Sequence, residues 1–214
     1  AMAMDKNGAF RDMERSEVRE RAEERGRDLI DRVGGCTAIP SGLYRKTDGM
    51  RVNARLDHYA LLGWSLQVLA DASARDIERP FNSDSLTEGF FEHLAGLSVL
   101  PEGPRLARVA LWQHGILLEC VPHLDKTYLD GAVLRRADGT PVIGMTLRHD
   151  RADNFWFVLF HELGHLFLGH LTDDNQFFAD DMDLMKESNP DHREDEADGF
   201  AVRALLPAGF DLDR

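Results

Sequence analysis

Apolar and polar positions follow a helical period through most of the first 115 residues. Residues 11–33 hold 7 Arg and 8 Asp/Glu and stop at Gly34-Gly35, which predicts a charged, solvated helix with many ion pairs. Residues 52–73 predict a strongly amphipathic helix. We expect one helical track in it along Leu56, Tyr59, Ala60, Gly63, Leu66, Gln67 and Ala70.

Two shorter helices are predicted before residue 115. The stretch SLTEGFFEHLAGLS predicts a helix with Ser85 as its N-cap and Glu88 completing a capping box. The stretch GPRLARVALWQHG predicts another, with Pro104 suited to its first turn and Gly115 to its end. Residues 34–50 are rich in glycine and turn residues and predict a linker.

From residue 115 the period changes to that of short strands. The β-prone runs are GILLECVP, LDGAVLRR and PVIGMTLR, and a turn at Asp138-Gly139 predicts a hairpin of the last two. The third run stands just before the next helix. We expect it to be an edge strand that can pair with an extended peptide.

Residues 154–170, NFWFVLFHELGHLFLGH, predict an apolar helix, followed by an acidic loop and a last helix, EDEADGFAVRALL, that ends at Pro207. The expected fold is therefore α+β. It has a helical N-terminal part, then a small antiparallel sheet packed on the apolar helix, and a C-terminal helix. We expect a charged helix and linker at 1–50, a helical subdomain at 51–100 and the main domain at 101–214.

Composition narrows the classes of function. Hydrophobic content of 43% and charged content of 29% are those of a soluble globular protein, and no apolar run is long enough to span a membrane. Residues 151–214 contain 5 Lys/Arg and 15 Asp/Glu, so they carry most of the chain's net charge of −13. Because such an acidic part repels other anions, we expect it to bind no nucleic acid and no anionic membrane. Two cysteines without a CxxC spacing, Cys36 and Cys120, and the lack of a secretory signal favour a cytoplasmic location.

The middle of the apolar helix contains three ionisable residues that would be costly to bury without compensation. His161 and His165 are four residues apart, so both rings face one side of a helix and can reach one metal ion. Glu162 projects about 100° further round and can take a proton from a metal-bound water. This HExxH pattern predicts a zinc hydrolase with Glu162 as catalytic base.

A third protein ligand is expected further along the chain. The metzincin spacing would need a histidine at position 171, which is Leu171, and we interpret His170 as an ordinary residue at the helix end. Glu194 is the favoured ligand because it shares a helix face with small apolar residues, whereas Glu196 lies on a more polar side. Asp198, four residues after Glu194, is expected to hydrogen-bond a ligating histidine.

A group that stabilises the oxyanion is harder to find in the sequence. Tyr128, in KTYLDGA, and His192 are the available polar candidates. Both residue types are more often structural, so Tyr128 is retained only as a candidate and His192 is not favoured.

The stretches GTPVIGMTLRHDRADNFWFVLFHELGHL and EDEADGFAVRALLP, together with TYLDGA, resemble the ImmA/IrrE family of metallopeptidases over roughly residues 100–208. The resemblance implies a metal site similar to that of thermolysin-like peptidases. It implies His161, His165 and Glu194 as zinc ligands and Glu162 as base. Many relatives, such as HigA-like regulators, carry a helix-turn-helix domain, and we find no such pattern in residues 1–100.

Studied members of that family act on transcriptional repressors and relieve repression of stress or mobile-element genes. By resemblance, we expect a cytoplasmic zinc endopeptidase that cleaves a regulatory protein such as a DNA-binding repressor. The alternative is a catalytically silent, antitoxin-type module that keeps the metal fold in order to bind a partner protein. The retained Glu162 favours the enzyme.

Overall fold

The computed structural model describes residues 15–35, 57–149, 151–171, 177–179 and 192–206. In the described part of the chain, helices come first and three strands follow, and a helix, a short fourth strand and a last helix come after them, as the α+β prediction requires. The elements are α1 (Arg15–Arg32), α3 (His58–Ser73), α4 (Glu88–Gly96), α5 (Gly103–Gln113), β1 (Leu117–Cys120), β2 (Gly131–Arg135), β3 (Pro141–Met145), α6 (Ala152–Phe167), β4 (Phe177–Ala179) and α7 (His192–Leu205).

The described strands form one sheet in the order β1-β3-β2-β4. β2 and β3 are the predicted antiparallel hairpin, with Val133 opposite Ile143. β1, however, pairs with β3 in parallel, so the prediction of an antiparallel sheet is wrong and the sheet is mixed. β3 lies between β1 and β2, and the prediction that it is an edge strand available to a peptide is therefore also wrong.

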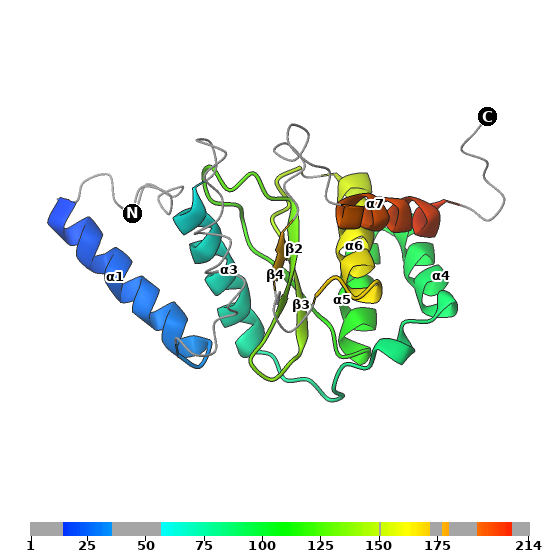
Figure 1. The fold of residues 1–214 in the computed structure, drawn as a ribbon, viewed down its shortest axis with the longest axis horizontal. Coiled ribbons are helices and arrows are strands. Elements are labelled where there is room, and N and C mark those ends of the chain that lie inside the picture. The colour runs from blue at the N-terminus through cyan, green and yellow to red at the C-terminus, as the bar shows by residue number, and fades with distance from the viewer. Residues whose placement is uncertain (1–14, 36–56, 150, 172–176, 180–191, 207–214) are drawn as a thin grey trace.

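Helices cover both faces of the sheet, with α1 and α3 on one side and α4 to α7 on the other (Figure 1). Each strand contributes side chains to the apolar clusters on both faces of the sheet, because successive side chains point to opposite faces. Val133 and Ile143 join the apolar cluster around α6, while Leu134 and Val142 join the cluster around α3. The described residues thus form two apolar cores, one on each face of the sheet.

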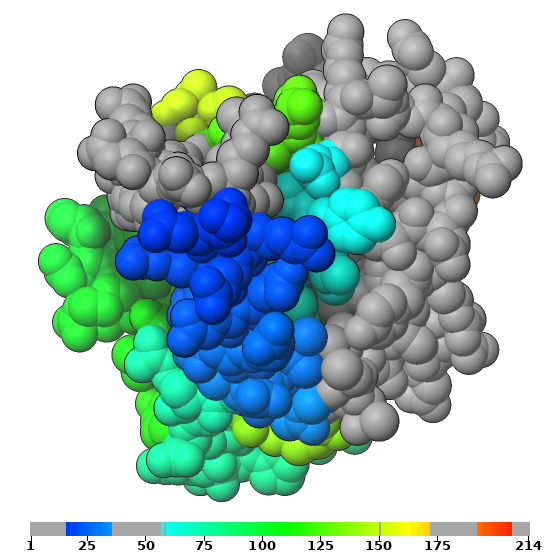
Figure 2. All heavy atoms as spheres, turned by 90° about the vertical axis from the view of Figure 1, so that its left-hand side faces the viewer, coloured from blue at the N-terminus to red at the C-terminus, as the bar shows by residue number. Residues whose placement is uncertain are grey.

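The charged helix α1 packs against α3 and lies on the outside of the described part of the molecule (Figure 2). It carries the predicted ion pairs along its exposed side, including Arg19–Glu23 at 2.8 Å and Arg25–Asp28 at 3.1 Å. Its last turns also contribute to the core, since Leu29 is fully buried. The prediction of a solvated helix therefore holds for most of α1, and Leu29 anchors its C-terminal end.

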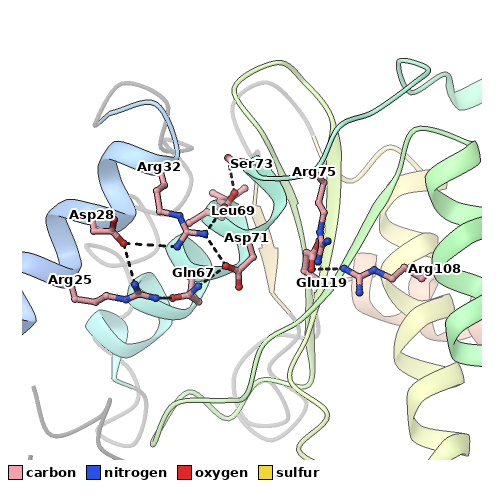
Figure 3. Close-up of polar contacts among 11 residues, drawn as sticks. Arg25, Asp28, Arg32, Gln67, Leu69, Asp71, Ser73, Arg75, Arg108 and Glu119 are labelled. Atoms are coloured by element: carbon pink, nitrogen blue, oxygen red, sulfur yellow. Dashed lines mark hydrogen bonds and ion pairs between the residues drawn. The ribbon is translucent and has the colours of Figure 1, made fainter. Parts of the chain in front are cut away.

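Polar contacts join α1 to α3, and two arginines contact Glu119 on β1 (Figure 3). Arg32 of α1 bonds Asp71 of α3 at 3.1 Å. On β1, the buried carboxylate of Glu119 lies between Arg75, after α3, at 3.0 Å and Arg108, on α5, at 2.8 Å. A buried charge is tolerated when it is paired in this way, so Glu119 fastens two helices to one strand.

The buried face of α3 agrees with the predicted track in part, since Ala60, Leu66 and Ala70 are buried. Tyr59 is 85% exposed, whereas Trp64 and Val68 are fully buried. The reason is that α3 lies between the sheet and α1, so most of its surface is covered and no single stripe describes it. Leu56, which we placed on the same track, lies outside the described residues.

Two helix ends agree with prediction and one does not. Pro104 is in the first turn of α5, and Gly115 follows its end with a φ of +75°. The N-cap of α4 is Thr87, whose hydroxyl accepts a hydrogen bond from the backbone N–H of Phe90, and not Ser85. Ser85 instead closes a short 3-10 turn capped by Asn82.

No helix among the described residues combines the length and apolar character needed to cross a membrane. The predicted division at residues 50 and 100 stays a prediction. α3, from the predicted second segment, packs directly on the strands of the third.

Candidate metal centre

Helix α6 carries the three ionisable residues into the core. It begins at Ala152, and its apolar side chains pack against the sheet, α5 and α7. His161, Glu162 and His165 are exposed by 1%, 0% and 0% of their surface. The apolar neighbours fix the helix, and with it the direction of these side chains.

Two histidine nitrogens and one carboxylate oxygen meet between α6 and α7. The Nε2 atoms of His161 and His165 are 2.9 Å apart. Oε2 of Glu194 lies 3.2 Å from Nε2 of His161 and 3.6 Å from Nε2 of His165. Glu194 therefore lies where its position on the helix predicted, whereas the side chain of Glu196 is not part of this cluster.

The close approach of α7 to α6 depends on small residues. Ala197 and Ala201 are completely buried. A Cβ added to Gly164, inside the HELGH sequence, would lie 3.2 Å from the Cα of Ala197. Glycine facing alanine lets the two backbones come near enough for the Glu194 side chain to reach both histidines.

Asp198, one turn after Glu194, contacts the first histidine from behind. Nδ1 of His161 and Oδ1 of Asp198 are 2.8 Å apart, so the Nδ1–H donates to the carboxylate. This fixes the ring and leaves the Nε2 lone pair directed at Glu194 and His165. The prediction that Asp198 orients a histidine agrees with this contact.

His170 is not the ordinary helix-end residue that we predicted. It is buried, with Nδ1 2.9 Å from Nδ1 of His165 and Nε2 3.2 Å from Oε2 of Glu196. His170 lies outside the three-residue cluster, in agreement with the spacing argument that it is not a metal ligand. It belongs, however, to the same buried network. The position of His170 could have been inferred from Gly169, because a glycine at a helix end often adopts a positive φ, here +74°, and turns the chain back toward the helix.

Glu162 lies against the first residue of β2. A Cβ built on Gly131 would come 2.8 Å from Oε1 of Glu162 and 2.6 Å from Cγ1 of Val158. The carboxylate therefore occupies space that only glycine at position 131 leaves free. β2 and α6 together determine where this side chain lies.

The electrostatics of the cluster favour the forms that bind metals. Burial alone would raise the pKa of Glu194, but its contacts with His161 and His165 outweigh burial and bring the pKa to about 2. Burial lowers the pKa of His165, against the opposing effect of Glu194. A deprotonated carboxylate and a neutral imidazole are the states that a metal ligand requires.

The donor set matches a tetrahedral ion in chemistry and in size. His161, His165 and Glu194 each offer one ligand atom, and these atoms lie within 4.8 Å of one another. Ligands about 2.0–2.2 Å from a tetrahedral zinc ion are about 3.3–3.6 Å apart. The observed separations of 2.9, 3.2 and 3.6 Å are close to that value. The site can therefore hold a metal ion.

The two other polar candidates do not join the cluster in the described part of the chain. Tyr128 is half-buried in the loop before β2, with a φ of +48°, and its hydroxyl makes no hydrogen bond there to the histidines or Glu194. His192 is 83% exposed and lies 3.3 Å from Oε1 of Glu196. A role for Tyr128 at the oxyanion stays a prediction.

Comparison with known families agrees with this arrangement. Residues 121–210 match the family model Peptidase_M78, described as the IrrE N-terminal-like domain. This segment is similar to the IrrE N-terminal-like domain. The match confirms the resemblance to the ImmA/IrrE family, and the family implies peptidase activity. No curated protein and no solved structure matches the chain significantly.

The matched segment contains every residue of the cluster. It runs from the end of β1 through β2, β3, α6 and α7, so both helices that meet at the site belong to it. Helices α1, α3, α4 and α5 precede it and cover the two faces of its sheet (Figure 1).

Proposed function

We propose that the chain is a zinc-dependent endopeptidase that cleaves a regulatory protein, and that its metal site is gluzincin-like. The observation that carries this proposal is the convergence of His161, His165 and Glu194 from two helices of a peptidase-family domain. Glu162, buried beside them, has the place of a base next to the first histidine. With three ligands among the described residues, the set fits hydrolysis of a peptide bond better than a structural metal site, which is usually closed by four protein ligands.

The two histidines and Glu194 hold the ion. When bound there, zinc supplies Lewis-acid chemistry, which acidifies water and polarises a carbonyl group. Two imidazoles and one carboxylate suit zinc, and among the described residues these three ligands leave a coordination position open, as in catalytic sites. Asp198 keeps the His161 ring in place through the Nδ1 contact.

Glu162 moves the proton. Its carboxylate takes a proton from the attacking water and delivers it to the nitrogen of the leaving peptide. The buried position beside Gly131 and Val158 holds the carboxylate in one place and excludes bulk water from it. Such a dry, preorganised site strengthens the electrostatic interactions that catalysis uses.

The proposed substrate is a DNA-binding repressor, by resemblance to studied relatives, and its cleavage relieves repression of stress or mobile-element genes. The acidic balance of residues 151–214 supports a protein substrate over direct contact with DNA. Recognition of DNA is then a property of the substrate and not of this domain.

The test compares the wild type with Glu162→Gln, which removes the base and keeps the shape of the side chain. Each zinc-loaded protein is incubated with a lysate of cells that express its natural regulators, and new N-termini are identified by mass spectrometry. We expect the wild type to cut a small number of proteins, among them a DNA-binding regulator, and Glu162→Gln to cut none. Both proteins should contain one zinc per chain.

Two results contradict the proposal. Cuts made equally by Glu162→Gln would show that Glu162 is not the base. A wild type that binds zinc and cuts nothing, yet captures the same regulator as the variant, would favour the alternative of a silent, antitoxin-type binding module.

A further inference from the structure

A line of polar side chains connects the buried ring of His165 to the surface of α7. His165 contacts His170 at 2.9 Å, His170 contacts Glu196 at 3.2 Å, and Glu196 contacts His192 at 3.3 Å. The exposed fraction of these side chains rises from 0% through 7% and 44% to 83%. The buried end of the line is the second histidine of the metal centre.

The backbone at the end of α6 puts His170 in this place. Gly169 adopts the left-handed conformation, and the N–H of His170 donates to the carbonyl of His165 at 3.0 Å. The N–H of Gly169 donates to the carbonyl of Leu166 at 3.4 Å. These two bonds define a Schellman motif, in which the residue after the glycine packs against the residue five positions earlier. Here that pair is His170 and His165.

The order of hydrogen bonds follows from the chemistry of the ring. A histidine that binds a cation through Nε2 carries its hydrogen on Nδ1. Nδ1 of His165 therefore donates to Nδ1 of His170. This leaves the hydrogen of His170 on Nε2, where Oε2 of Glu196 accepts it at 3.2 Å.

Both histidines of the centre are thus supported from α7, in different ways. Asp198 contacts His161 directly, and Glu196 acts on His165 only through His170. Three acidic residues at alternate positions, Glu194, Glu196 and Asp198, serve three separate contacts. Glu196 therefore has a role distinct from that of Glu194.

Resting on the proposed zinc site, we propose that His170 is a positioning residue, which holds the His165 ring for metal binding and is itself oriented by Glu196. Loss of an outer hydrogen-bond partner of a ligating histidine lowers metal affinity by about 10–100-fold. His170 is then needed for affinity and geometry, although it contacts no metal itself.

The first test measures Zn²⁺ affinity by competition with a chromophoric chelator. His170→Phe keeps a ring and removes the acceptor, so we expect its affinity to fall about 10–100-fold. His170→Asn should recover most of the affinity, because the amide oxygen can stand where Nδ1 was. Glu196→Ala should weaken binding in the same direction as His170→Phe. The matched control is Asp195→Asn, an exposed acidic residue on the same helix, which should bind zinc like the wild type.

The second test separates positioning from a general loss of stability. Co²⁺ is bound in place of zinc, and the visible absorption spectrum is recorded for each variant. We expect the spectrum of His170→Phe to differ from that of the wild type, and that of His170→Asn to resemble it. In the double variant, Glu196→Ala should add little to the effect of His170→Phe, because Glu196 acts through His170.

Wild-type affinity and spectrum in His170→Phe, or fully additive effects in the double variant, would overturn the proposal. Failure of the proposed zinc site is recognised separately, because the wild type itself would then bind no zinc. Should His170→Phe not fold, Glu196→Ala and His170→Asn still decide the question, since Glu196 is partly exposed.

Discussion

At the scale of single residues, Gly131 determines the space in which Glu162 lies. The backbone there places a Cβ 2.8 Å from Oε1 of Glu162 and 2.6 Å from a methyl group of Val158, both shorter than real contacts allow. Alanine at this position must therefore displace the carboxylate or the strand. The site depends on the absence of one methyl group.

We expect Gly131→Ala to lower the cleavage rate by roughly 10²-fold, since a shift of about 1 Å in a catalytic group can cost that much. Stability should fall by about 1–3 kcal/mol, as is typical of overpacking. Zinc content should not change, because Gly131 contacts the base and not the ligands. The measurements are cleavage kinetics, thermal unfolding and metal analysis.

Gly26→Ala serves as the control for that variant. Gly26 lies in α1 with nothing within 4 Å of an added Cβ, so alanine there should stabilise the helix by up to about 1 kcal/mol. A Gly131→Ala protein with full activity would show that Glu162 does not need its observed position.

The residues of the cluster could be found from the sequence because they obey one local rule, the geometry of a helix. Four-residue spacing puts His161 beside His165, and Glu194 beside Asp198, before any tertiary contact is known. His170 failed that rule because it lies beyond the helix end. Its position depends on the left-handed Gly169, a signal that we used for other helix ends but not for this one.

At the scale of elements, the contact between α6 and α7 controls the metal centre, since each helix supplies part of the donor set. Gly164, Ala197 and Ala201 form the close contact, and none of them is chemically reactive. Their small size sets the separation of the helices. The distance from Glu194 to the two histidines then follows from that separation.

We expect Ala197→Leu to push the helices apart, to lower stability by about 1–3 kcal/mol and to weaken zinc binding. Ala197 is fully buried, so a larger side chain has no free space to enter. Calorimetric zinc titration and thermal unfolding measure the two effects. Ala152→Leu makes the same change at an exposed position on α6 and should alter stability by at most about 0.5 kcal/mol. Equal zinc affinity in Ala197→Leu and the wild type would contradict the role given to this contact.

Elements were predicted better than their pairings. The helices of the described region, the hairpin at Asp138-Gly139 and the end of α5 at Gly115 all follow local patterns. The parallel pairing of β1 with β3 follows no local pattern, because it depends on the path of residues 121–130 between β1 and β2. The cap of α4 was misplaced for a related reason. Ser85 and Thr87, two positions apart, can each start a helix, and Ser85 belongs to the preceding 3-10 turn.

At the scale of the whole molecule, the sheet separates two apolar cores. One contains α6 and the metal centre, and the other contains α3 and the buried end of α1. Leu29 belongs to the second core, and its helix α1 lies on the opposite side of the sheet from α6 (Figure 1). The geometry of the metal centre should therefore be insensitive to packing at α1.

We expect Leu29→Ala to lower stability by about 2–5 kcal/mol, as for other buried leucines, while zinc affinity at low temperature stays that of the wild type. Unfolding by denaturant and zinc titration are measured on the same sample. Arg27→Ala, on the exposed side of α1, is the control and should change neither quantity appreciably. A loss of zinc affinity in Leu29→Ala would mean that the two cores are coupled across the sheet.

The zinc content of Glu194→Ala, compared with that of Glu196→Ala, is the sharpest test of the proposed metal centre. Both variants remove one carboxylate from α7, but only Glu194 approaches the Nε2 atoms of the two histidines. We predict one zinc per chain in the wild type and, at saturating metal, in Glu196→Ala, and almost none in Glu194→Ala. Full zinc in Glu194→Ala, with loss of zinc from Glu196→Ala, would contradict the proposed centre.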